Sequence, residues 1–97
     1  MKLRFLEVTY RRGKAMAAYF YLPRQSGDVS VRTERHEPGL VLDFAQDGRA
    51  IGVEITAPRA FSLEILNRAL ASVSETPATA DDVAPLLSSA ASADSPV

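Results

Sequence analysis

The chain has 97 residues, no cysteine and a net charge of −1. This length predicts one small domain, and the lack of cysteine excludes a disulfide framework. The lack of cysteine also removes thiolate nucleophiles and leaves zinc only oxygen and nitrogen ligands. Charged residues interrupt the apolar ones throughout the N-terminal stretch, so it has neither a signal-peptide core nor a membrane span. We therefore expect a soluble protein of the reducing cytoplasm.

Charge is distributed unevenly along the chain. Residues 1–59 contain ten Lys or Arg against seven Asp or Glu, a net charge of +3, whereas residues 60–97 contain one against five, a net charge of −4. The simplest interpretation is an acidic C-terminal segment beside a mildly basic sheet. Nucleic-acid binding is disfavoured, because the basic cluster Arg11, Arg12 and Lys14 is short and the sequence pI is 5.7.

The first sixty residues have the character of β-strands. Residues 3–10 are rich in β-forming side chains, and the next four supply a turn in which Gly13 can take a positive φ. Residues 15–22 are apolar on both faces, which is typical of a central strand, although Tyr19 and Tyr21 can keep their hydroxyls in water. Residues 29–35 alternate and predict a half-solvated strand with Val29 and Val31 facing inward.

A second hairpin is indicated by Asp47-Gly48 between two alternating apolar runs. A two-residue type I′ loop would pair Phe44 with Ile51, and it would place all six large apolar side chains of the two strands on one face. A three-residue loop would send Ile51, Val53 and Ile55 to the other face, which a buried sheet forbids. The pattern therefore favours the two-residue loop.

In that register Asp43 and Glu54 are diagonal neighbours on the opposite face, with Cα atoms roughly 7 Å apart. Two carboxylates this close could bind a divalent cation or act as an acid and a base. They could equally be solvated charges balanced by Arg32 or Arg49. We favour this structural interpretation, because the sequence places no other ligand-type residue beside them.

These residues carry a resemblance to a known family. The segment from Asp43 to Ile55, with the AAYF run at 17–20 and Tyr10 upstream, resembles the bacterial DUF2283 family over roughly residues 3–58. The signature positions, whose role is unknown, are Tyr10, Asp43, Asp47, Gly48, Gly52 and Glu54. The resemblance implies a binding partner more than a reaction, since some members are encoded beside small proteins in toxin–antitoxin-like pairs. The chain departs from the family at residues 11–14, where members usually have an acidic turn.

The last third of the chain begins with a predicted helix. Ser62 can cap it, Phe61 and Leu66 are positioned as a hydrophobic staple, and leucines recur at helical spacing after Ser62. A second short helix is predicted near Asp82, and disorder beyond residue 90. We thus expect an α+β fold, an antiparallel meander of about five strands with this helix on one face. Residues 1–74 would form the sheet-plus-helix domain and residues 75–97 an Ala/Ser/Asp/Pro-rich segment.

Other catalytic patterns are absent from the sequence. The single histidine, His36, is expected to be a solvated loop residue, with metal ligation helped by Glu34 and Glu37 as the alternative. No G-x-S-x-G elbow and no phosphate-binding glycine loop occur. We therefore assign no catalytic, cofactor or metal residues.

Coverage of the sheet leads to the functional hypothesis. Five strands span roughly 19 Å and one helix about 10 Å, so one helix should leave about half of the apolar face open. A homodimer or a small protein partner would cover the rest, which indicates a non-enzymatic interaction module, antitoxin-like or regulatory. The alternative is a small hydrolase or metal-dependent enzyme that uses Asp43, Glu54 and His36 at a dimer seam.

Overall fold

The computed structural model describes residues 4–87 and has five strands in one antiparallel sheet. The strands are β1 (Phe5–Arg11), β2 (Lys14–Tyr21), β3 (Arg32–Glu37), β4 (Leu40–Phe44) and β5 (Ala50–Ile55). They are followed by η1 (Pro58–Ala60), α1 (Leu63–Ser72) and η2 (Asp81–Val83), and the helical turn that starts at η2 continues to residue 87. The predicted α+β fold is confirmed, including the second short helix.

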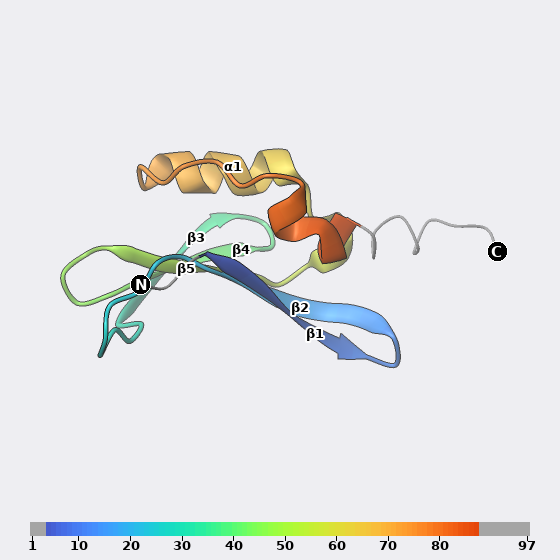
Figure 1. Ribbon diagram of the computed structural model, residues 1–97, viewed down its shortest axis with the longest axis horizontal. Coiled ribbons are helices and arrows are strands. Elements are labelled where there is room, and N and C mark those ends of the chain that lie inside the picture. The colour runs from blue at the N-terminus through green and yellow to red at the C-terminus, as the bar shows by residue number, and fades with distance from the viewer. Residues whose placement is uncertain (1–3, 88–97) are drawn as a thin grey trace.

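The strand order is β1-β2-β5-β4-β3. The sheet is meander-like, because hairpins join β1 to β2, β3 to β4 and β4 to β5, while residues 22–31 carry the chain between its two halves. Both α1 and the C-terminal helical turn lie on the same side of the sheet (Figure 1). The sheet therefore has one helix-covered face and one face without a helix.

The β1–β2 hairpin closes at the turn predicted for residues 11–14, and the loop of this turn has two residues. Arg11 pairs with Lys14, and Arg12 and Gly13 both have positive φ values, of 54° and 78°. Positive φ at both central positions is the geometry of a type I′ turn. The register shifts once, between Thr9 and Tyr10, where Met16 is the extra residue of a bulge in β2.

The β4–β5 hairpin combines the predicted register with a different turn. Leu42 pairs with Val53 and Asp43 with Gly52, as predicted, but Phe44 pairs with Ala50 and not with Ile51. Only Gly48 has a positive φ, and the Ala45 amide bonds the Arg49 carbonyl at 2.9 Å, so the loop has three residues. The two-residue prediction is therefore wrong. A bulge at Ile51 restores the register and keeps the later apolar side chains on the core face.

Strand β3 begins three residues later than the sequence predicts. Val29 and Val31 are 64% and 57% exposed, so their predicted inward orientation is wrong. These valines lie in the connection from β2 to β3. The course of the backbone there, and not the alternation of side chains, decides which of them are exposed. His36, predicted in a loop, instead lies in β3 and is half-buried.

Within one copy of the chain the helix-covered face is buried except toward the β1–β2 turn, where Tyr10 is 52% exposed. Phe20, Leu42 and Val53 are fully buried, in one core with Leu66 and Leu70 of α1. Ala78, Val83 and Leu86 of the C-terminal segment complete that core. The expectation that half of this face stays open is wrong, because the coverage estimate omitted residues 76–87.

Two polar side chains fasten that C-terminal segment. Arg4 donates to the carbonyls of Thr76 and Pro77 at 2.7 and 2.9 Å. Asn67 of α1 donates to the Ala78 carbonyl at 3.2 Å and accepts from the Ala78 amide at 2.7 Å. The segment is therefore attached both to the start of β1 and to α1.

Helix α1 has well-defined ends. The Ser62 hydroxyl accepts from the Ile65 amide at 3.1 Å, which confirms the predicted N-cap. At the other end the Glu75 amide bonds the Leu70 carbonyl, and Ser74 has a φ of 62°, as in a Schellman motif. Among residues 4–87, no helix has the length and apolar character needed to cross a membrane.

Candidate functional site

The sheet face without a helix carries most of the polar and aromatic clustering, and we call it the open face. Register places these residues on it: Phe5, Glu7, Thr9, Arg11, Ala17, Tyr19, Tyr21, Thr33, Arg35, Val41, Asp43, Gly52 and Glu54. Neither α1 nor the C-terminal helical turn lies on this side (Figure 1).

A tyrosine spans three strands at the centre of the open face. The Tyr19 hydroxyl donates to Asp43 Oδ2 at 2.7 Å, although β5 lies between their strands. The ring crosses β5 at Gly52, where a Cβ atom would overlap Cε1, Cζ and the hydroxyl of Tyr19. Gly52 is therefore the residue that lets Tyr19 reach Asp43, and two signature positions have one shared structural role.

Asp43 is buried, with an exposed fraction of 7%. The sequence interpretation of Asp43 as a solvated charge balanced by Arg32 or Arg49 is wrong. Arg32 pairs with Glu34 at 2.9 Å, and Arg49 pairs with Asp28 and Asp47. Asp43 is instead held by Tyr19, because β2 brings that side chain over it.

Tyr19 is a hydrogen-bond donor and not an acid at neutral pH. Burial, followed by the hydrogen bond to Asp43 and the charge of Asp43, raises the pKa of the Tyr19 phenol well above its ordinary value of 10. Arg24 acts in the opposite direction, since its Nη2 donates to the Tyr19 oxygen at 3.1 Å. The net result is a protonated, positioned phenol.

Beside this cluster an aromatic row reaches the surface. The rings of Phe5 and Tyr21 stack at 4.3 Å between centroids with an interplanar angle of 12°, and Tyr21 contacts Tyr19 at 4.6 Å. Arg24 lies over the rings of Tyr19 and Tyr21. Phe5 is 48% exposed, so the row ends in an apolar side chain accessible from solvent.

Glu7 fixes the polar side of this row. The Tyr21 hydroxyl donates to Glu7 Oε1 at 3.1 Å. Burial and this hydrogen bond raise the pKa of the Tyr21 phenol. The Glu7 carboxylate is therefore held in place on an exposed part of β1.

The signature residues Asp47 and Gly48 serve the turn. Asp47 accepts from the Arg49 backbone and from Arg49 Nε, the latter at 2.7 Å, while Arg49 also makes a bidentate contact to Asp28 at 2.8 and 3.2 Å. Hydrogen bonds from Arg49 lower the pKa of both aspartates. Arg49 thus joins the β4–β5 turn to the connection between β2 and β3.

The other candidate residues are not brought together. Glu54 is exposed on β5, Tyr10 is 52% exposed near the β1–β2 turn, and His36 lies on β3. His36 Nδ1 is buried without a hydrogen-bond partner within residues 4–87. No group of three or more His, Cys, Asp or Glu within the described residues could hold a metal ion. The three residues of the enzyme alternative therefore do not form one cluster in a single copy.

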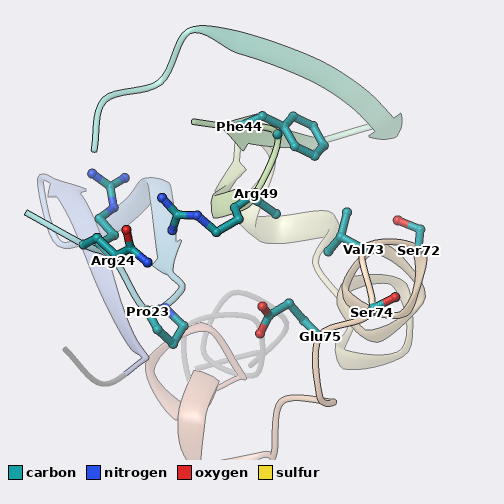
Figure 2. Close-up of a pocket in the computed structure, with 11 residues that line it drawn as sticks. Pro23, Arg24, Phe44, Arg49, Ser72, Val73, Ser74 and Glu75 are labelled. Atoms are coloured by element: carbon teal, nitrogen blue, oxygen red, sulfur yellow. The ribbon is translucent and has the colours of Figure 1, made fainter. Parts of the chain in front are cut away.

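A cleft of about 700 Å³ opens at the end of α1. Figure 2 shows Glu75 directed into the space between Pro23 and Arg49, with Ser72, Val73 and Ser74 on one side. The Arg49 guanidinium is already bound by its two aspartates. Arg24 and Glu75, the other charged side chains of the lining, contact Tyr19 and Arg4, so the charged groups of this cleft already have partners.

The sequence did not indicate the contacts of Arg24 and Asp28 or the span from Tyr19 to Asp43. Arg24 and Asp28 lie in a connection whose path is not encoded by periodicity. The contact of Tyr19 depends on β5 lying between β2 and β4, which the sequence does not specify. The one local signal was the apolar outer face of β2, which placed Tyr19 in a partly covered position.

These features define a small α+β protein whose sheet has one helix-covered and one open face. Residues 16–57 match the family DUF2283, described as protein of unknown function, which confirms the resemblance over that segment. The match runs from β2 to just beyond β5, so β1 and Tyr10 lie outside it. Comparisons with curated proteins and with solved structures gave no match.

Proposed function

We propose that the protein is a non-enzymatic interaction module that forms a homodimer through the open face. The observation that carries the proposal is the aromatic row of Phe5, Tyr21 and Tyr19 on the side of the sheet that α1 and the C-terminal helical turn leave uncovered. Half-exposed aromatic side chains grouped on one face are typical of interaction surfaces.

A second copy of the same chain is the occupant that we favour. The exposed charges of the open face have both signs: Glu7 and Glu54 are negative, and Arg11 and Arg35 are positive. A surface with both signs can pair with itself under a two-fold axis, and two-fold dimers are the commonest small oligomers. Net charge on the whole chain is only −1, so repulsion between copies is weak.

The geometry supports binding more than catalysis. Asp43, the only buried carboxylate within residues 4–87, is occupied as a hydrogen-bond acceptor, and its tyrosine partner keeps its proton at neutral pH. In this proposal the dimer serves as a regulatory or antitoxin-like component. The cysteine-free composition agrees with a cytoplasmic setting.

Light scattering coupled to size exclusion tests the proposal. We expect the wild-type chain of 10.5 kDa to elute with twice that mass at micromolar concentration, and Phe5→Glu to elute as a monomer with unchanged circular dichroism. Val29→Glu is the matched control, since Val29 is also an exposed apolar residue but lies outside the sheet. A monomeric wild-type protein would rule out the homodimer.

A further inference from the structure

The open face of β1 has an ordered charge pattern. Residues two apart in a strand share one face, so Phe5, Glu7, Thr9 and Arg11 form one row. Glu7 and Arg11 lie at equal distances on either side of Thr9, and about 13 Å separates them along the strand. The row therefore carries a negative and a positive charge placed symmetrically about a small residue.

The positive end of this row lies on a projecting arm. β2 pairs with β5 only from Ala18 to Tyr21. Residues 9–17 of the β1–β2 hairpin therefore extend beyond β5 (Figure 1). Its turn holds Arg11, Arg12 and Lys14, which are all exposed. None of these three cations makes an ion pair within residues 4–87.

We propose that the two copies of the dimer pack their β1–β2 hairpins antiparallel across the open faces, with the two-fold axis beside Thr9, so that Arg11 of each copy pairs with Glu7 of the other. This inference rests on the homodimer proposed above and names its geometry. The basic arm of each copy then lies over the acidic and aromatic base of its partner.

Three features of the hairpin fit this arrangement. Thr9 pairs with Ala17, so two small side chains lie at the axis and allow the faces to approach closely. Phe5, four residues before Thr9, meets the turn at Gly13 of the other copy, which has no side chain and open space around its Cα. Glu7 is already positioned by the Tyr21 hydroxyl, which reduces the entropy lost when it pairs.

Charge exchange at these two positions tests the geometry. Each pair occurs twice per dimer, so Glu7→Arg or Arg11→Glu alone should raise the dimer dissociation constant at least ~10-fold, because like charges then meet at both contacts. The double variant Glu7→Arg/Arg11→Glu should return to within ~3-fold of wild type, since the pairs are re-formed with reversed polarity. Analytical ultracentrifugation measures all four proteins. The inference would be overturned if the double variant lost as much dimerisation free energy as the two single variants together.

A cross-linking experiment provides a second measurement that does not depend on charge. Because the chain contains no cysteine, Thr9→Cys introduces a single thiol, and facing sheets lie about 10 Å apart. A short bis-maleimide of that span should join two Thr9→Cys chains, whereas Ala71→Cys, on the exposed side of α1, should remain uncrosslinked.

The outcomes distinguish the antiparallel geometry from the homodimer on which it rests. The wild type could be a dimer that Phe5→Glu dissociates, while the charge exchange has no effect and Thr9→Cys does not cross-link. That result would support the open-face dimer and overturn the antiparallel geometry. A monomeric wild type overturns both. Binding of random-sequence DNA that is lost on Arg11→Glu, with the dimer mass unchanged, would overturn the assignment of the arm to a second copy.

Discussion

Replacing Gly52 by alanine tests the central structural link of the open face. Gly52 has no positive φ, so the backbone itself accepts an alanine, and alanine is about 0.5–1 kcal/mol more favourable than glycine inside a strand. The added Cβ, however, would overlap the ring of Tyr19. The substitution therefore acts by displacing that ring.

The cost follows from what Tyr19 leaves behind. Within residues 4–87, its 2.7 Å hydrogen bond is the only one that the Asp43 side chain makes, and Asp43 is 7% exposed. Hydrogen bonds to charged groups contribute about 1.5–3 kcal/mol. After the alanine gain is subtracted, we expect Gly52→Ala to lower the free energy of unfolding by roughly 1–2 kcal/mol.

Urea unfolding followed by circular dichroism measures the effect, at one protein concentration because self-association adds to apparent stability. The control is the same substitution in a Tyr19→Ala background, where no ring remains to be displaced. There Gly52→Ala should be neutral or stabilising by up to ~1 kcal/mol. An equal loss in both backgrounds would refute the argument, since the cost could not then arise from Tyr19.

Three further substitutions test other parts of the fold. Ser74→Gly should raise the free energy of unfolding by about 0.5–1 kcal/mol, because Ser74 has the left-handed conformation that glycine adopts without strain. Arg49→Ala should weaken the loss of stability at acidic pH. Asp28 and Asp47 have pKa values below the ordinary 3.8, so their contribution to stability is present above that pH and is lost as the pH falls through the lowered values. Urea midpoints measured across acidic pH would show the difference. Arg4→Ala should cost about 1–2 kcal/mol and speed amide exchange in the C-terminal segment, measured by mass spectrometry.

Matched controls accompany these three variants. Ser72→Gly, at the last residue of α1, should destabilise by ~1 kcal/mol, because glycine increases the conformational entropy of the unfolded chain and the hydrogen bond from the Ser72 hydroxyl to the Ala69 carbonyl is lost. Arg59→Ala removes an exposed cation that makes no ion pair within residues 4–87, so it should change neither the acid dependence nor amide exchange. If Arg59→Ala reproduced the effect of Arg49→Ala or Arg4→Ala, general charge loss and not the named contacts would be responsible.

The β4–β5 hairpin shows which parts of the fold a sequence can predict. Register was predictable because a slip of one residue would move Val53 and Ile55 from the core to solvent, and each buried aliphatic side chain is worth about 1.5–3 kcal/mol. Turn type was not, because Asp47-Gly48 suits a two-residue loop and also a three-residue loop with glycine last. A single bulge at Ile51 reconciles the longer loop with the required register.

Segments that depend on distant partners were predicted less well. Val29 and Val31 alternate as in a strand, but they lie in the connection between β2 and β3. The position of this connection is fixed by the ion pair between its Asp28 and Arg49 of the β4–β5 hairpin. The complete cover of the core also depends on a long-range contact, that of Arg4 with residues 76 and 77. Periodicity describes which face a residue occupies, but not which distant segment lies on that face.

The two carboxylates that the sequence places together have different roles in the structure. Asp43 and Glu54 share the open face, yet Asp43 is covered by Tyr19 while Glu54, directly opposite Tyr19 in the register, remains exposed. A cation bound between them would have to compete with the phenol for Asp43, and the hydroxyl donates a hydrogen bond without desolvating a second charge. From Asp43 to Glu54 the structure therefore contains one buried acid that accepts from Tyr19, one glycine that leaves room for the Tyr19 ring, and one exposed acid.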